Sequence, residues 1–180
     1  MADFMDIITG RRSTRKYEAR PVADDVLEKV LEAGRWAQSW ANTQCWEIVV
    51  VRDAATKEKL QGTIKGGNPS IDAIVAAPVL LAVCGKTERA GYYKGMAVTK
   101  FGDWLLFDLG VLSQNIALAA HALGLASVVV GLFDHEAARE VLGVPDGHEV
   151  VTLMPLGYPA GSVEAPPRRE VSDFTHYDAF

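Results

Sequence analysis

The chain has 180 residues, of which 49% are apolar, and its formal net charge is −5. This length suits one domain, taken here as residues 1–180, and the apolar content supports a packed core and excludes wholesale disorder. The acidic total argues against a generic nucleic-acid-binding or membrane-surface protein.

Apolar spacing and turn residues predict several elements in the first half of the chain. Residues 47–53 form a predicted strand, and the continuous run Ile48–Val51 indicates burial on both of its faces. The polar residues 39–46 before it read as a loop. Helices are predicted over 3–12, 20–38, 54–64 and 71–77.

The second half predicts three more strands and two more helices. The strands fall at 79–85, 127–133 and 149–159, with a glycine- and aromatic-rich candidate lid at 86–102. A helix over 134–143 has Asp134 as its N-cap and Gly143 as its stop. Strands separated by helices indicate an α/β or α+β sheet flanked by helices.

The apolar run from Trp104 to Phe133 needs testing as a membrane span. A long helix opens it, with Asp103 as the expected N-cap, and polar residues such as Asp108 and His121 interrupt it. Polar groups at bilayer depth are costly, so we expect no membrane span. A helix buried on nearly all sides instead suggests a large core or a subunit interface.

The cysteines and the first residues bear on location. Cys45 and Cys84 lie far apart and form no C-x-x-C pair, which fits a reducing compartment. The opening MADFMDIITG lacks the basic-then-apolar order of a secretory signal. We therefore expect a cytoplasmic protein.

Several catalytic signatures are absent from the sequence. There is no G-x-G-x-x-G opening a helix, no phosphate-binding G-x-x-x-x-G-K-[ST] and no G-x-S-x-G elbow. The four histidines have no metal-ligand spacing. Neither a metal site nor nucleophilic hydrolase chemistry is expected.

A basic cluster, RRSTRKY at 11–17, stands out in this acidic chain. Arginine presents a planar fork that matches phosphate oxygens, and serine adds a short donor. In an extended segment Arg11, Ser13 and Arg15 would lie on one side. On composition alone, an anion site and a solvated basic loop are equally good explanations.

A second polar stretch, SWANTQCW at 39–46, offers donors and acceptors framed by Trp40 and Trp46. Such a set suits the edge of a heteroaromatic ligand. Taken alone, this loop favours a plain helix-to-strand connection with Trp46 in the core.

Together these motifs resemble the nitroreductase family of FMN-dependent oxidoreductases. The resemblance rests on R-[RH]-S-x-R-x-[YF] at 11–17, S-x-x-N-x-Q-x-W at 39–46 and a long central helix at 108–127. It continues through GLFDHEAAREVLGVP, LMPLGYP and PPRREVSDFTHYD, and so spans nearly the whole chain. It implies an α+β fold with a central mixed sheet flanked by helices, an intertwined homodimer, and two FMN molecules at the interface.

The resemblance also implies three groups of FMN contacts. The basic cluster and the tail would hold the phosphate and ribityl side, the 39–42 loop would approach the flavin from the other subunit, and a loop near 130 would lie against the ring with a backbone N–H near flavin N5. The residues are Arg11, Arg12, Ser13, Arg15, Arg168 and, as a weaker candidate, Arg169; then Ser39, Trp40 and Asn42; then Val129, Val130 and Gly131.

The sequence departs from the family pattern at three places. Cys45 stands where the family usually has proline. No lysine aligns with the one that often reaches the flavin from the helix before the second strand, and Asn68 or Ser70 would replace the accompanying asparagine. The residues before Gly131, SVVV, are unusually apolar.

By resemblance, the chemistry belongs to the flavin, with no catalytic side chain. NADH or NADPH would give a hydride, and a small aromatic acceptor such as a nitroaromatic or quinone would take the electrons in a ping-pong cycle. Three alternatives remain: a specialised member that breaks down flavin, dehalogenates or oxidises heterocycles; a non-catalytic flavin-binding redox sensor; and a phosphate-ligand or nucleic-acid binder, which the acidic total disfavours.

Overall fold

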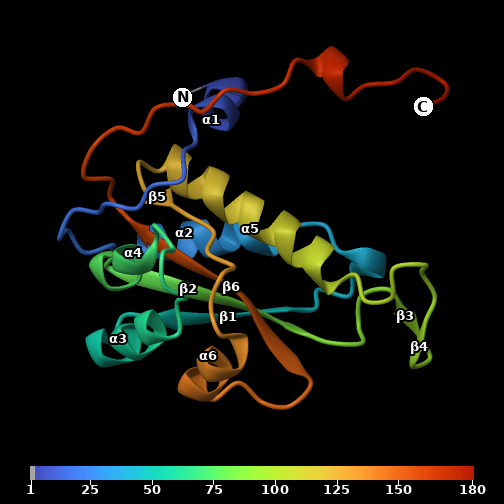
Figure 1. Ribbon diagram of the computed structural model, residues 1–180, viewed down its shortest axis with the longest axis horizontal. Helices are drawn as coiled ribbons and strands as arrows, with labels where there is room; N and C mark the ends of the chain where they lie inside the picture. The colour runs from blue at the N-terminus through green and yellow to red at the C-terminus, as the bar shows by residue number, and fades with distance from the viewer. Residues whose placement is uncertain (1–2) are drawn as a thin grey trace.

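The computed structural model describes residues 3–180, which form one four-stranded sheet with helices on both faces and a small hairpin at one end (Figure 1). The helices are α1 (Phe4–Gly10), α2 (Asp24–Arg35), α3 (Ala54–Gly62), α4 (Ile71–Ala76), α5 (Leu105–Ala122) and α6 (His135–Leu142), with short 3-10 turns η1 (Trp40–Asn42) and η2 (Val171–Asp173). The strands are β1 (Trp46–Val51), β2 (Val79–Lys86), β3 (Tyr92–Tyr93), β4 (Met96–Ala97), β5 (Ala126–Ser127) and β6 (His148–Gly157).

The sheet has the order β1-β2-β6-β5, and every ladder between these strands is antiparallel. The α+β fold and the flanking helices are therefore confirmed. The expected mixture of strand directions reduces to one isolated parallel bridge between Ser13 and Ser127. Strand direction depends on how the connections run, which the residue types within a strand do not encode.

Two hydrophobic cores lie on the two faces of the sheet. Alternate residues of β2 point in opposite directions, so Leu81 packs with α2 and α5 while Leu80 packs with α3, α4 and α6. Strand β2 is buried on both faces. The predicted burial of 48–51 on both faces is wrong, because β1 is an edge strand and Val50 is 39% exposed.

Helix α5 crosses one face of the sheet and is buried along one side. Leu109, Leu112 and Ile116 are fully buried, but Leu106 and Phe107 are 69% and 54% exposed. The expectation of burial on nearly all sides is therefore wrong for the single chain. By length and mean hydropathy (1.3) α5 alone, within residues 3–180, could cross a membrane, and 44% of it is buried inside the structure.

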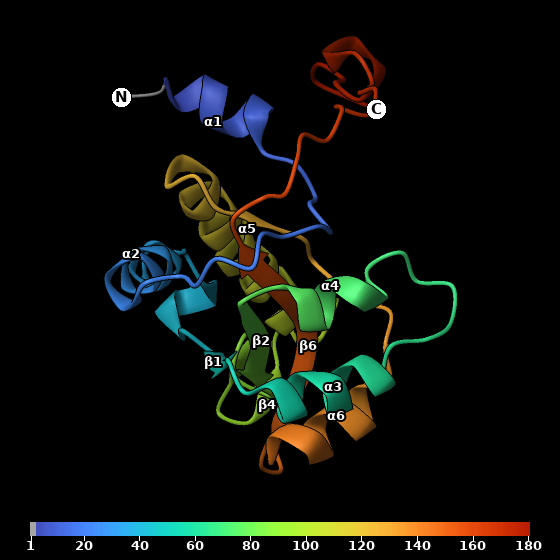
Figure 2. The same cartoon turned by 90° about the vertical axis from the view of Figure 1, so that its left-hand side faces the viewer.

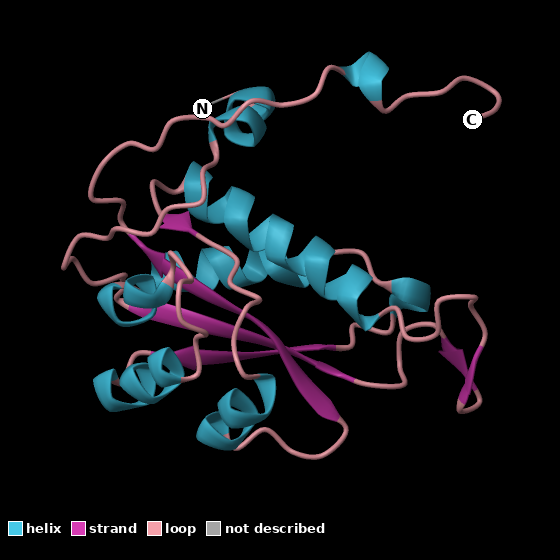
Figure 3. Cartoon of the chain, viewed as in Figure 1, coloured by secondary structure: helices cyan, strands magenta, loops and turns pink. Residues whose placement is uncertain are grey.

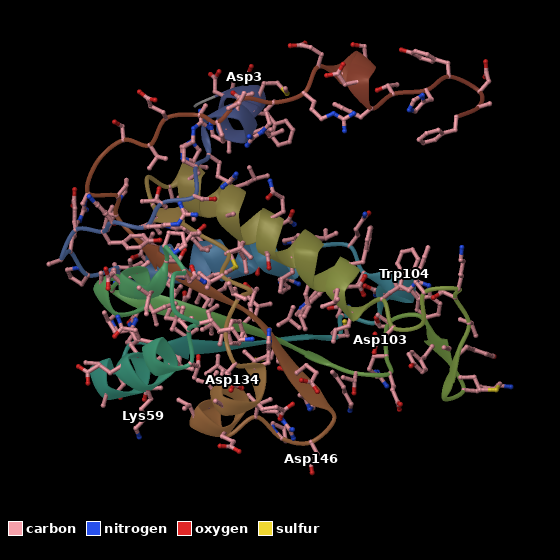
Figure 4. All side chains as sticks on the ribbon, in the orientation of Figure 1. Asp3, Lys59, Asp103, Trp104, Asp134 and Asp146 are labelled. Atoms are coloured by element: carbon pink, nitrogen blue, oxygen red, sulfur yellow. The ribbon has the colours of Figure 1, made fainter. Side chains whose placement is uncertain are left out.

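The bounds of the 127–133 strand and of the long helix shift in the structure. The strand expected at 127–133 is reduced to β5 and one bridge between Val130 and Leu153. Helix α5 begins at Leu105, and the Asp103 carboxylate accepts from the Leu105 N–H at 2.9 Å (Figure 4). By contrast, α6 begins and ends as predicted: Asp134 accepts from the Ala137 N–H, and Gly143 adopts the left-handed conformation that glycine favours.

The tail leaves the sheet after Ala160 and runs, mostly without regular structure, past the same side of the molecule as α1 (Figures 2 and 3). Val171, Phe174 and Tyr177 in this tail are all exposed. The chain exposes 10789 Å², whereas a compact monomer of this length exposes about 8500 Å². The excess exposed area comes from the two ends of the chain, which the rest of the chain leaves largely uncovered.

Candidate functional site

The basic cluster lies on an extended segment fixed to the end of β5. The Thr14 N–H donates to the Ser127 carbonyl at 3.1 Å, beside the Ser13–Ser127 bridge. Thr14 is buried, so its neighbours Ser13 and Arg15 point the other way, as expected for an extended segment.

The tail brings Arg168 to this cluster. Together they line a pocket of about 370 Å³, formed by Arg11, Arg12, Ser13, Arg15, Val163, Glu164, Pro166 and Arg168. Within residues 3–180 none of its four arginines forms an ion pair. Four guanidinium groups gathered without carboxylate partners favour an anion that accepts charge-assisted hydrogen bonds.

Arg12 is placed differently from its neighbours. Its Nη1 donates to the carbonyls of Thr9 at 2.6 Å and Arg11 at 2.8 Å, at the end of α1. Its Nε is buried without a partner among the described residues. Arg12 therefore fastens the end of α1 as well as lining the pocket. Arg169 does not line the pocket; it donates to the Asp173 carbonyl.

A chain of hydrogen bonds joins the cluster to the loop around Gly131. Arg15 Nε donates to Ser70 Oγ at 3.0 Å, and the Ser70 N–H donates to Asn68 Oδ1 at 2.9 Å. Asn68 Nδ2 then donates to the Leu132 carbonyl at 3.2 Å. Asn68 and Ser70 thus lie between the basic cluster and the 129–132 loop.

The three residues expected beside the flavin ring differ in what they can offer. Val130 is buried, and its N–H and carbonyl both pair with Leu153 at 2.9 Å. Val129 is exposed, and the Gly131 N–H has no partner within residues 3–180. An added Cβ on Gly131 would meet no atom within 4 Å. The Gly131 N–H is therefore open to a ligand, as is the Val129 N–H, which likewise has no partner within residues 3–180.

Ser39, Trp40 and Asn42 form a tight turn at the other end of the molecule. Gln44 ties the turn together, since its N–H donates to Ser39 Oγ at 3.0 Å and its Nε2 donates to Asn42 Oδ1 at 3.1 Å. The Trp40 N–H donates to the buried carboxylate of Asp108. Sequence reasoning missed this role of Asp108, although a lone aspartate in an apolar helix was a signal.

The basic cluster and the 39–42 turn lie at opposite ends of α5 (Figure 1). Trp40 contacts Asp108 in the first turn, whereas Arg11 shares a cavity of about 320 Å³ with His121 in the last turn. Thirteen residues of helix span about 20 Å. A single chain therefore does not bring the two groups onto one ligand.

Cys45 is buried at the end of this turn, with Sγ 3.7 Å from Asp108 Oδ2. Burial, and then the Asp108 charge, raise the pKa of the thiol to about 12. Burial also raises the pKa of Cys84 to about 11. Neither thiol has the thiolate character of a reactive cysteine.

Residues 86–102, the candidate lid, contain the β3–β4 hairpin and lie at the same end of α5 as the 39–44 turn (Figure 1). This segment carries four cations and one acid, and within the described chain none of these charges forms an ion pair. Lys94 lies 5.3 Å from the ring of Tyr93, and Lys100 lies 5.5 Å from that of Phe101. The hairpin is thus a basic and aromatic surface.

Comparison with known proteins gives a consistent result. The family model described as the nitroreductase family matches residues 8–75 and 71–158. An NADH dehydrogenase of Thermus thermophilus is 31% identical over 83% of this chain and 83% of its own length. An NADPH-flavin oxidoreductase of Vibrio harveyi is 29% identical over 100% of this chain and 75% of its own. A nitroreductase family protein of Clostridium difficile 630 has a TM-score of 0.84, at 26% identity, over 99% of this chain and 100% of that one.

Proposed function

This chain belongs to the nitroreductase family, and we propose that it reduces nitroaromatics, quinones or related acceptors with electrons from NADH or NADPH. It is an FMN-dependent oxidoreductase. The Vibrio harveyi relative supports this, since its solved structure, a NADPH:FMN oxidoreductase complexed with NAD+, has a TM-score of 0.80 and 26% identity.

The observation that carries the proposal is the pocket of unpaired arginines. A phosphate dianion would offset most of the positive charge of Arg11, Arg15 and Arg168, which have no carboxylate partners within residues 3–180. The Ser13 hydroxyl adds a donor. Arg12 would act mainly by holding the end of α1, and Arg169 by ordering the tail. The donor set thus fits the phosphate end of FMN.

The chain's own part in the chemistry is to bind and orient the flavin. When bound, FMN would supply the redox chemistry of a two-electron transfer from NAD(P)H to the acceptor. The Gly131 N–H, which has no partner within residues 3–180, can donate to the ring, while Asn68 or Ser70 would replace the asparagine that the family often brings to the flavin. Val130 supports this loop through its pairing with Leu153.

We further propose that the working unit is a homodimer. Trp40 contacts Asp108 in the first turn of α5, and Arg11 lies near His121 in its last turn, about 20 Å further along the helix. A second copy would bring Ser39, Trp40 and Asn42 to the flavin. The exposed side of α5, which includes Leu106 and Phe107, and the uncovered tail supply apolar surface of the kind that subunits bury.

The hairpin at 86–102 suits the phosphates of the nicotinamide cofactor. Its three excess positive charges lie beside the 39–44 turn, which would contribute to the flavin site of the partner subunit. Positive charge there would draw in the anionic dinucleotide, and the aromatic side chains offer surfaces for stacking. The enzyme would act in the cytoplasm, where both buried thiols stay reduced.

Steady-state kinetics with FMN-loaded protein would test the proposal. NADH and NADPH are each varied at several fixed concentrations of a nitroaromatic, a quinone or free FMN. Parallel double-reciprocal lines with at least one acceptor support the ping-pong oxidoreductase. A yellow, dimeric protein that turns over none of these acceptors would support the redox-sensor alternative instead.

A further inference from the structure

Asp108 is a carboxylate buried in the protein interior without a cation beside it. It lies in the first turn of α5 and is 1% exposed, and within residues 3–180 it forms no ion pair. Burial raises its pKa, which the Trp40 N–H and the Cys45 thiol partly oppose. Burying a charged carboxylate costs free energy. The hydrogen bonds of Asp108 must therefore fix a local conformation that apolar packing alone would not.

The carboxylate holds both ends of one short loop. Its two oxygens lie 3.0 and 3.1 Å from the Trp40 nitrogen, which donates to both. At the other end, Cys45 Sγ donates to Oδ2 at 3.7 Å. Trp40 and Cys45 are the first and last residues of the segment 40–45, which is therefore clamped by a single side chain.

The segment between these two anchors is strained. Ala41, Asn42 and Gln44 have φ angles of 45°, 55° and 46°, in the left-handed region that non-glycine residues seldom occupy. Such conformations persist only when the surroundings over-determine them. Gln44 ties the turn internally, but Asp108 is what fixes it to α5.

We propose that Asp108 is a positioning residue of the flavin site, whose carboxylate clamps residues 40–45 so that Ser39, Trp40 and Asn42 meet FMN across the subunit interface. This inference rests on the proposed function for the flavin, but the clamp itself does not. Asp108 touches neither flavin nor substrate on this account. It acts through the loop.

Two nearly isosteric replacements of Asp108 separate the effect of its hydrogen bond to Trp40 from the effect of its charge. Asp108→Asn keeps an oxygen that can accept from the Trp40 N–H. Asp108→Leu fills the same space, removes the buried charge and leaves that N–H without a partner. Loss of the buried carboxylate offsets part of the cost of that unpaired donor, so the leucine variant should fold. Leu109→Ala, one residue along α5, is the matched control, because it lowers stability without removing a hydrogen bond from the loop.

The experiment measures the exchange rate of the Trp40 amide in FMN-free protein and the FMN dissociation constant of each variant. For Asp108→Leu we expect both to rise about tenfold or more, because a buried donor has lost its acceptor. For Asp108→Asn we expect both within about threefold of wild type. For Leu109→Ala we expect a lower Tm but FMN affinity within about threefold.

Two outcomes would overturn the inference. One is an Asp108→Leu protein with wild-type amide exchange and FMN affinity. The other is a Leu109→Ala protein that loses as much FMN affinity as Asp108→Leu, since the effect would then follow stability. A wild-type protein that binds no FMN refutes the proposed function instead, and amide exchange at Trp40 still decides whether the clamp exists.

Discussion

Arg15 Nε donates a hydrogen bond of 3.0 Å to Ser70 Oγ, joining residues 55 positions apart in the sequence. Ser70 is buried and is held in turn by Asn68. The bond therefore fixes the guanidinium of Arg15 beside the arginine pocket rather than leaving it to move with solvent. It also couples the proposed phosphate site to the loop that carries Gly131.

Alanine in place of Arg15 or Arg168 should weaken FMN binding about tenfold or more, because each removes a charge-assisted contact to phosphate worth roughly 1.5–3 kcal/mol. Flavin fluorescence titration of the apoprotein measures this. Arg20→Ala is the control, since Arg20 stacks over Tyr158 and does not line the pocket. Full FMN retention in the Arg15/Arg168 double variant would place the phosphate elsewhere.

Arg12→Ala should behave differently from Arg15→Ala. Its Nη1 donates to two carbonyls at the end of α1, so its loss should lower stability by about 1 kcal/mol or more. FMN affinity should change less than in Arg15→Ala when each variant is measured well below its Tm. A loss of affinity as large as that of Arg15→Ala would show that Arg12 holds the phosphate directly.

Phe107→Glu should break the homodimer and release FMN together. The side chain is exposed in the single chain, so a charge there should leave the fold of one subunit intact. Sedimentation velocity and flavin content measure the two effects. Lys59→Glu is the control, because α3 packs on the opposite face of the sheet from α5 (Figure 4). A stable, flavin-loaded monomer of the wild type would refute the dimer.

Replacing Lys94 and Lys100 by alanine should raise the KM for NADPH and NADH several-fold while leaving FMN affinity unchanged. The reason is the loss of two unpaired positive charges from the hairpin proposed to meet the dinucleotide phosphates. Raising ionic strength should increase KM in the wild type and much less in the double variant. Equal KM values in both proteins would remove the hairpin from the dinucleotide site.

Cys45→Ala should leave flavin reduction by NAD(P)H within a few-fold of wild type, because the buried thiol carries no thiolate at working pH. The raised pKa means that the folded state disfavours the thiolate. Its contribution to stability is therefore full below pH 9.0 and lost as pH rises toward about 12. Urea unfolding across this range should show a shallower alkaline loss in Cys45→Ala. A variant that keeps FMN but loses turnover by orders of magnitude would contradict the inert role.

The sequence predicts best where the signal is local. Asp134 and Gly143 delimit α6 because capping needs only nearby backbone groups. The alternation of Ser13 and Arg15 likewise follows from an extended segment. The gathering of Arg168 with this cluster was accessible through the family resemblance, since no local pattern links the tail to residue 11.

Other features depend on contacts between distant residues. The edge position of β1, and hence the exposure of Val50, follows from strand order, which the apolar run at 48–51 does not encode. The Asp108 clamp needs the 40–45 loop to lie against the first turn of α5. For the same reason, the sequence does not predict that one side of α5 is exposed in the single chain. An apolar residue gives the same sequence signal whether its own chain or a partner subunit covers it.

Anaerobic mixing of the FMN-loaded protein with NADH or NADPH tests the central claim most directly. The account predicts that the visible absorbance band of the flavin bleaches at a rate at least as fast as turnover, and that a nitroaromatic or quinone restores it. An FMN-loaded dimer whose flavin band neither nucleotide bleaches would contradict the account.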